Sequence, residues 1–284
     1  MPFTFTYTAT QETTVKRLLA AQGVSHRLLR KLFDAQCVTL DHHAVRNVAV
    51  HPGQKVTMTL PPEAGLAISH EPVAVTLETA NWLIVNKPAG LASVPGPSQP
   101  TDSLLNRIGG FLQQEGIAGP QPAIITRLDR DTTGLVLVAK HAFAQGRLDA
   151  LGVNQAVSKT YLAVVGGTPA PSGHLTWPLA KAADGIHREV RADGQAAVTD
   201  YQVVTQGPHA AVVRVKLVTG RTHQIRAHFA YMGHPLIGDA LYGGDTRVFT
   251  RQLLQASELQ LTDPFTSQVL SAVLPQPAAW QAAL

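Results

Sequence analysis

The chain has 284 residues, of which 45% are hydrophobic and 15% are charged. This composition is typical of a folded globular protein and excludes a disordered chain. A single cysteine, Cys37, excludes an intramolecular disulfide and a zinc site built from cysteines. No apolar run approaches the roughly 20 residues that cross a bilayer, and the N-terminal sequence lacks the basic start and apolar core of a secretory signal. We therefore expect a cytoplasmic protein that does not enter a membrane.

The formal net charge is +4, and all of the excess lies in residues 1–62. This segment holds seven Lys and Arg against three Asp and Glu, whereas the rest of the chain holds sixteen of each sign. A basic segment beside a neutral one is typical of a polyanion-binding module attached to an enzyme. A merely soluble basic surface would have the same charge.

The N-terminal segment begins with two runs of helical spacing. Apolar residues predict a first helix over residues 12–22, which Gly23 ends. Ser25 is the residue type of an N-cap and precedes a second predicted helix over residues 26–35. One polar face of the second helix carries three cations, which repel one another unless an anion is supplied: Arg27, Arg30 and Lys31.

Two extended runs follow, at residues 37–40 and 55–60, with a turn at residues 51–53 between them. This helix–helix–strand order resembles the S4 RNA-binding domain. The resemblance also rests on two short sequences, Val24-Ser25 before the basic helix and Pro52-Gly53-Gln54-Lys55-Val56 before the last strand. It implies that residues 1–62 are a small S4-like α/β module that binds RNA through its basic helix.

Residues 63–71 have neither helical nor strand periodicity, and we expect them to link this module to a larger domain, residues 72–284. There, short β-prone runs and helical stretches alternate irregularly. The β-prone runs are residues 82–86, 135–139, 161–165 and 211–218, and the helical stretches are residues 102–115, 141–151, 222–232 and 246–257. Several strands are close enough to pair as hairpins, which predicts an α+β fold with a mixed, largely antiparallel sheet and flanking helices.

A compact group of charges lies between two apolar runs in residues 124–138, as expected for a loop at the end of a buried strand. Asp129 is flanked by Arg127 and Arg130, whose charges favour an ionised carboxylate. Such a carboxylate can act as a nucleophile or stabilise a developing sugar cation. The spacing alone favours a different interpretation, a salt-bridged turn in which Asp131 binds backbone amides.

A family resemblance favours the catalytic interpretation. Residues 127–134 are very similar to the catalytic motif of the RluA family of pseudouridine synthases, in which the aspartate at the Asp129 position is the essential carboxylate. Further segments match in the family's order across nearly all of residues 72–284: Asn86-Lys87-Pro88-Ala89-Gly90-Leu91, Lys159-Thr160-Tyr161, residues 217–228, residues 233–239 and Leu241-Tyr242. The resemblance implies that Tyr161 stacks on the target base and that Arg226 pairs with Asp129.

The chain departs from the family pattern at three positions. Thr126 stands where the family commonly has a histidine before the Arg-Leu-Asp triplet, Gln195 where a lysine is often seen, and Gln255 where a C-terminal segment has a histidine. None of these changes removes the carboxylate, the tyrosine or the arginine. They put the identity of the RNA substrate in doubt.

The third matching segment is compatible with a helix that begins at about residue 222. His223 and Arg226 are then neighbours on one helical face. His223 and His228 are five residues apart, which is not the spacing of a helical metal pair, and we expect no metal site. We expect Arg221 and His223, together with Arg127, to contact RNA.

The resulting hypothesis is isomerisation of uridine to pseudouridine in ribosomal or transfer RNA. The enzyme would extrude the uridine, cleave its glycosidic bond with Asp129, rotate the uracil and re-attach it through C5, with Tyr161 stacked on the base and assisting proton removal. No small-molecule cofactor is implied, and we expect a monomer. Two alternatives stay open: an RNA-binding protein with an inactive synthase domain, and a glycoside hydrolase that uses Asp129 and Asp131 as its paired carboxylates.

Overall fold

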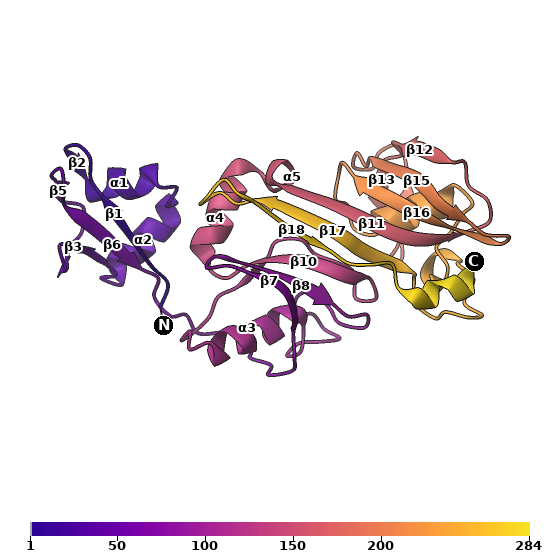
Figure 1. Cartoon of the computed structure of the whole chain (residues 1–284), viewed down its shortest axis with the longest axis horizontal. Coiled ribbons are helices and arrows are strands. Elements are labelled where there is room, and N and C mark those ends of the chain that lie inside the picture. The colour runs from indigo at the N-terminus through magenta and orange to yellow at the C-terminus, as the bar shows by residue number, and fades with distance from the viewer. Residues whose placement is uncertain (1) are drawn as a thin grey trace.

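The computed structural model describes residues 2–284, and its N-terminal part forms a small body at one end of an elongated molecule (Figure 1). In this N-terminal unit a four-stranded sheet has the order β1-β6-β3-β4, and β2 pairs with β5. Its elements are β1 (Thr4–Thr8), β2 (Thr13–Thr14), α1 (Val15–Ala21), α2 (His26–Asp34), β3 (Val38–Leu40), β4 (His43–Ala44), β5 (Ala49–Val50) and β6 (Lys55–Thr59).

Both predicted N-terminal helices are present, and the first is shorter than expected. Thr13 belongs to β2, and the side chain of Thr14 caps α1 by accepting a hydrogen bond from the amide of Arg17. The predicted cap of α2 is confirmed, because the Ser25 hydroxyl accepts from the amide of Leu28 at 3.2 Å. Strand β1 was not predicted, and its alternating half-buried and exposed residues form the edge of the sheet.

The rest of the chain is built around a ten-stranded sheet with the order β12-β15-β16-β11-β17-β10-β8-β7, in which β18 adds to β17 and β9 adds to β10. All of these pairs are antiparallel except β10 with β17, which confirms the predicted mixed, largely antiparallel α+β fold. The strands are β7 (Ala74–Glu78), β8 (Trp82–Lys87), β9 (Ala123–Ile124), β10 (Thr133–Ala139), β11 (Val157–Gly166), β12 (Ser172–Leu175), β15 (Thr199–Gln206), β16 (Ala210–Leu217), β17 (Leu254–Thr262) and β18 (Val269–Val273).

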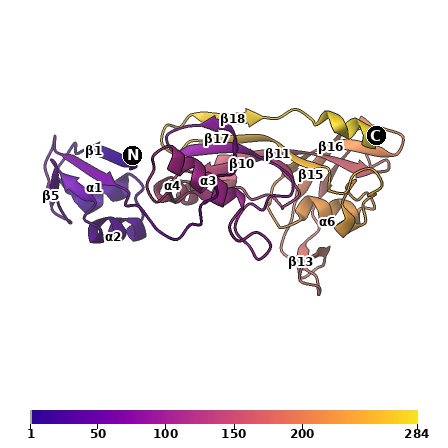
Figure 2. The ribbon, with the colours of Figure 1, turned by 90° about the horizontal axis from the view of Figure 1, so that it is seen from below.

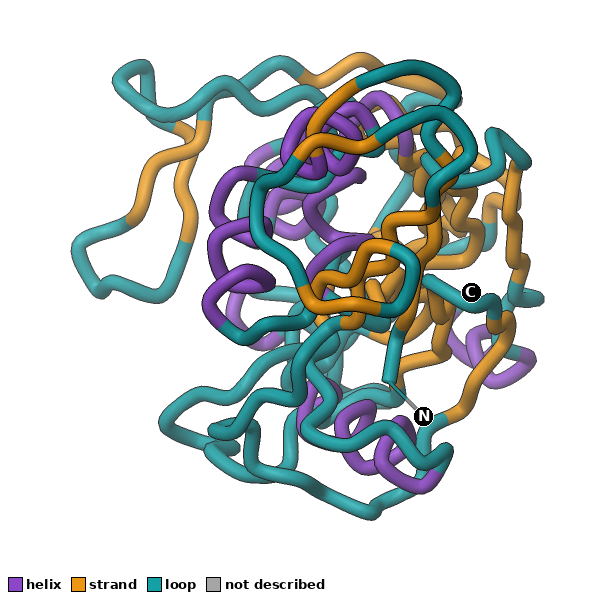
Figure 3. Tube along the Cα trace, turned by 90° about the vertical axis from the view of Figure 1, so that its left-hand side faces the viewer, coloured by secondary structure: helices purple, strands orange, loops and turns teal. Residues whose placement is uncertain are grey.

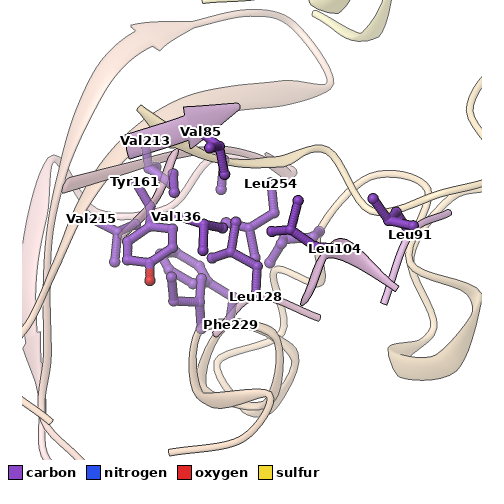
Figure 4. Packing of buried hydrophobic residues seen from close by; sticks show 14 of the residues in the cluster. Val85, Leu91, Leu104, Leu128, Val136, Tyr161, Val213, Val215, Phe229 and Leu254 are labelled. Carbon is purple, nitrogen blue, oxygen red and sulfur yellow. The ribbon is translucent and has the colours of Figure 1, made fainter. Parts of the chain in front are cut away.

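The helices of this larger part are α3 (Leu104–Gln114), α4 (Ala142–Leu151), α5 (Val153–Ala156) and α6 (Gln224–Tyr231), followed by the 3-10 helices η1 (Ala240–Tyr242) and η2 (Ala278–Ala283). Helices α3 and α6 lie on the same side of the sheet (Figure 2). There, Ile108 of α3 and Phe229 of α6 are fully buried in one cluster with residues of β8, β10, β11 and β16. Figure 4 shows Tyr161 in this cluster beside Val213, Val215 and Phe229.

A separate hairpin projects from the body on the side of α6 (Figures 2 and 3). It consists of β13 (Leu179–Lys181) and β14 (Arg188–Val190). The base of this hairpin contacts the candidate site described below.

The predicted helix over residues 246–257 is wrong. Its second half begins the strand β17, which is paired with β11 on one side and with β10 on the other. The sequence of this stretch has apolar residues at spacings that fit either a helix or a buried strand. As a strand, this stretch satisfies the backbone hydrogen-bonding groups of β10 and β11, which would otherwise face each other unpaired. This tertiary pairing outweighs the local helical propensity.

An aromatic cluster joins the N-terminal unit to the larger part. The ring of Phe5 on β1 packs edge-on against Phe143 of α4 at 5.0 Å and stacks on Phe265 at 6.2 Å. Phe3 lies 4.4 Å from the ring of His141, which caps α4. Phe143 is 1% exposed and belongs to the core of the N-terminal unit. The two parts therefore share buried apolar surface as well as the connecting chain.

The connecting segment, residues 60–73, forms no helix or strand and lies against α3. Asn106 donates to the carbonyl of Ala67 at 2.8 Å. Leu66 and Ile68 approach Gly109 so closely that a Cβ atom there would lie within 2.9 Å of both side chains. Through these contacts the segment packs along α3.

Candidate active site

Asp129 lies in the loop between β9 and β10, where the sequence placed it. The loop is fixed from beneath by Lys87, a fully buried residue whose ammonium donates to three carbonyl oxygens: those of Pro88 at 2.9 Å, Leu91 at 2.7 Å and Arg130 at 2.8 Å. Burial lowers the pKa of Lys87 to about 8, and the charges of Asp131 and Asp129 offset part of that effect. The lysine thus ties two loops together beside the carboxylate.

A second fixed point of this loop is Leu128. The Ser93 hydroxyl donates to the carbonyl of Leu128 at 2.7 Å and accepts from its amide at 3.0 Å. At the far end of the loop, Gly134 has a φ of 108° and lies so close to β17 that a Cβ atom would be 2.3 Å from the carbonyl oxygen of Ala256. Only glycine fits there, because the parallel pairing of β10 with β17 brings the backbones together.

Arg226 of α6 lies between two aspartates. Its Nη1 donates to Asp129 at 3.1 Å, which is the pairing that the family resemblance implies. Its Nε and Nη2 donate to the two carboxylate oxygens of Asp239, at 2.6 and 2.8 Å. Burial lowers the pKa of Arg226, but the hydrogen bonds and charges of Asp239 and Asp129 outweigh it and leave the pKa raised. The guanidinium is therefore a fixed cation beside Asp129.

His223 precedes α6 in a left-handed conformation, with a φ of 56°, and its Nε2 is 3.8 Å from Asp129. Burial lowers the pKa of His223, Asp129 opposes this effect and Arg226 adds to it. Tyr242 supports both residues, because its hydroxyl lies 3.1 Å from Nδ1 of His223 and its ring lies 5.0 Å from the guanidinium of Arg226. The same hydroxyl accepts from the amide of Arg188 at 2.8 Å, which anchors the projecting hairpin.

Tyr161 is on β11 and is 5% exposed. Burial, and to a lesser degree the charge of Asp129, raise its pKa, so the side chain is a neutral phenol. It borders a cavity of about 570 Å³ whose lining includes Asp129 together with Arg127, Arg130, Lys159 and Arg221. A smaller cavity of about 60 Å³ shares Asp129 and Tyr161 and adds His223 and Arg226. The cleft is thus lined by several cations around one carboxylate.

The six residues predicted to bind RNA fall into two groups. Arg127 and Arg221 are exposed at the cleft, and His223 lines its inner part. The other three are on α2 of the N-terminal unit and do not line the cleft: Arg27, Arg30 and Lys31. Lys31 forms an ion pair with Glu63 of the connecting segment.

Asp239 and Tyr242 had no predicted role. Both lie in segments that match the family, and that match was the one signal of their importance. Asp239 directly precedes the 3-10 helix η1 and Tyr242 ends it, so their contacts with Arg226 join this segment to α6, and no spacing rule predicts such a contact. One departure from the family pattern has a structural role: Thr126 is 2% exposed, and its hydroxyl accepts from the amide of Leu137 at 2.8 Å, so it fixes the start of the loop that carries Asp129.

Asp131 faces away from the cleft. It pairs with Arg130 at 2.9 Å rather than with backbone amides, and it borders a different cavity together with Ala89 and Thr133. Asp129 and Asp131 therefore do not form the paired carboxylates of a glycoside hydrolase.

Within residues 2–284, no three His, Cys, Asp or Glu side chains gather as potential metal ligands. In the same part of the chain, no helix combines the length and the apolar character that crossing a membrane requires.

Comparisons with known proteins show which family the sequence is similar to. The sequence profile of the family described as RNA pseudouridylate synthase matches residues 81–231. An uncharacterized RNA pseudouridine synthase of Bacillus subtilis, YjbO, is 35% identical over 271 residues, which are 93% of this chain and 95% of that protein. The ribosomal large subunit pseudouridine synthase D of Zymomonas mobilis is 32% identical over 279 residues, or 89% of this chain and 87% of that one.

Among solved structures, human RNA Pseudouridylate Synthase Domain Containing 1 shares the fold, with a TM-score of 0.61 and 22% identity over 76% of this chain and 86% of that chain. The sequence matches and the fold lead to one assignment. The chain belongs to the RNA pseudouridylate synthase family, in which it is of the RluA type, and it is an RNA pseudouridine synthase.

Proposed function

We propose that Asp129 is the catalytic carboxylate with which this enzyme isomerises uridine in structural RNA. The observation that carries the proposal is the position of Asp129: it is ionically paired with a buried arginine, bordered by Tyr161 and open to a cleft lined by cations. No other carboxylate lines the large cavity in the described part of the chain.

In the proposed reaction the target nucleotide leaves its stack and enters the cleft, at a cost of a few kcal/mol. Stacking of the uracil on Tyr161 offsets about 1–3 kcal/mol of this cost, and contacts between cations of the enzyme and RNA phosphates offset the remainder. Asp129 initiates breakage of the N1–C1′ bond, the uracil rotates, and a C5–C1′ bond forms. The proton on C5 is removed and N1 gains one, so the product is an isomer. Tyr161 is a neutral phenol and assists at C5 by relaying this proton.

The proposed substrate is ribosomal or transfer RNA, with large-subunit ribosomal RNA favoured by the name of the Zymomonas mobilis relative. The N-terminal unit serves as an S4-like RNA-binding module, residues 1–62, which holds the RNA while residues 72–284 carry out the reaction in the cytoplasm. The support for this role is the exposed pair Arg27 and Arg30 on α2, which has no ion-pair partner among the described residues.

The test is to incubate the wild-type enzyme and the Asp129→Asn variant with total RNA from cells that lack this protein, and then to map pseudouridine. We expect new pseudouridine at defined sites with the wild-type enzyme and none with the variant, while circular dichroism and RNA affinity stay unchanged. Pseudouridine formation by the variant would exclude Asp129 as the catalytic carboxylate. Binding without product by the wild-type chain would favour the inactive RNA-binding protein.

A further inference from the structure

Lys159 is a cation in the cleft without a partner. It lies two residues before Tyr161 on β11, so the two side chains leave the same face of the strand, and both line the cavity of about 570 Å³. Lys31, Lys87 and Lys140 each bind a carboxylate or backbone carbonyls. The ammonium of Lys159 makes no hydrogen bond or ion pair with any residue from 2 to 284.

Lys159 is half-buried in the lining of the cavity. Burial lowers the pKa of Lys159, and no charged neighbour offsets that effect. The charge of Asp129, in contrast, acts on both Tyr161 and Lys87. The lining of the cavity that holds Lys159 also includes Val153 and Asn154 of α5.

A partly buried ammonium without a partner is costly, and a full negative charge offsets this cost better than a neutral carbonyl does. RNA offers such a charge at every nucleotide. We propose that Lys159 binds a backbone phosphate of the RNA beside the extruded uridine, and so sets how far that nucleotide enters toward Tyr161. This inference rests on the proposed function. The two Cα atoms are about 7 Å apart along the strand, so one nucleotide can place its base on Tyr161 and its phosphate at Lys159.

The experiment measures the affinity of a fluorescein-labelled oligouridylate of about twelve nucleotides over a series of KCl concentrations. Lys159→Met removes the charge and keeps most of the apolar stem, and Lys159→Arg restores the charge. Lys216→Met is the matched control, because Lys216 is exposed on the same sheet, opposite Thr160, and its side chain leaves the other face of β16 from the cavity-lining Leu217.

For Lys159→Met we expect binding about tenfold weaker and a slope of log affinity against log salt that is less steep by about 0.7, the value of one phosphate on a single strand. Lys159→Arg and Lys216→Met should keep the wild-type slope. At limiting RNA, pseudouridine formation by Lys159→Met should fall about tenfold in parallel with binding, and Lys159→Arg should restore it.

An unchanged salt slope in Lys159→Met, with the wild-type enzyme active on total RNA, would overturn the phosphate contact. A reduced maximal rate with an unchanged slope would also overturn it and would instead assign Lys159 to the base. If the slope falls as expected and the wild-type chain forms no pseudouridine, the phosphate contact stands and the proposed reaction fails.

Discussion

Asp239 holds Arg226 more firmly than Asp129 does. Two of the guanidinium nitrogens of Arg226 bind the two oxygens of Asp239, whose side chain is 1% exposed, and one nitrogen is left for Asp129, whose side chain is 26% exposed. The arginine is thus oriented by a buried carboxylate before any RNA arrives. Asp129 keeps carboxylate lone pairs that are not engaged by Arg226 and that face the cleft, as a reacting carboxylate needs.

Replacing Asp239 tests this orientation. Asp239→Asn leaves a buried guanidinium without its main counter-charge, and we expect the free energy of unfolding to fall by about 3 kcal/mol. Pseudouridine formation in single turnover should fall at least tenfold, while RNA affinity changes little. Asp245→Asn breaks the exposed pair with Arg247 and is the control, whose stability should stay close to that of the wild type. Full activity in Asp239→Asn would show that Asp129 does not depend on the orientation of Arg226.

Tyr161 has two proposed roles that two substitutions separate. Tyr161→Phe keeps the aromatic face and removes the hydroxyl, so we expect nearly wild-type RNA affinity and a slower formation of product. Tyr161→Leu also removes the face, and RNA affinity should fall by about 1–3 kcal/mol, the value of one stacked base. Affinity is measured by titration and product by rapid quench. Equal affinity of the two variants would argue against stacking.

Lys87 is expected to be a structural cation. Lys87→Met leaves three carbonyl oxygens, one of them buried and two partly buried, without their ammonium donor, which should lower the free energy of unfolding by about 2–4 kcal/mol and loosen the loop that carries Asp129. Urea denaturation measures the first effect, and amide hydrogen exchange in residues 125–132 measures the second. Lys216→Met is again the control. Unchanged exchange in this loop would contradict the role of Lys87.

The junction between the N-terminal unit and α4 should be sensitive to acid. Burial, with a smaller contribution from Lys140, lowers the pKa of His141 to about 4. The unfolded chain takes up this proton below about pH 6.5 and the folded chain only below about pH 4. The free energy of unfolding therefore decreases as the pH is lowered from about 6.5 to about 4, by at most about 3 kcal/mol. Protonation also removes the lone pair of Nδ1, which accepts from the amide of Ala144 at 3.1 Å.

His141→Asn keeps an N-cap residue and removes the titration. We expect the urea midpoint of this variant to change less than that of the wild type between pH 7 and pH 4.5. Parallel changes in both proteins would assign the acid sensitivity to other groups.

The N-terminal unit should contribute to RNA affinity through Arg27 and Arg30. Replacing both with Gln removes two exposed cations, and the slope of log affinity against log salt should become less steep by up to about 1.8 on a duplex RNA region. Arg247→Gln, far along the chain and already paired with Asp245, should leave the slope unchanged. A wild-type slope in the double variant would show that Arg27 and Arg30 of α2 do not contact RNA phosphates.

Local patterns in the sequence were enough for the elements that depend on local physics. Ser25 is an N-cap because its hydroxyl reaches an amide three residues away, and the apolar runs that became β8, β10, β11 and β16 are continuous enough to be recognised as buried strands. The likeness of residues 127–134 to a known motif located Asp129. The helix predicted for the stretch that forms β17 is wrong because the apolar pattern fits both a helix and a buried strand. Only the pairing with β10 and β11 determines that it is a strand.

By itself, the sequence determined the family, the loop that holds Asp129 and the presence of a basic N-terminal segment, because these depend on residues that are close together in the chain. The tertiary structure alone decided that Asp239 orients Arg226, that Asp131 turns away from Asp129, and that Lys159 is left without a partner in the cleft. Each of these facts depends on contacts or their absence between residues of distant segments, and the distance between two such side chains is set by the packing of the sheet and its helices. The charged turn around Asp129 is a catalytic candidate because that packing places a buried arginine, a tyrosine and an open cavity around it.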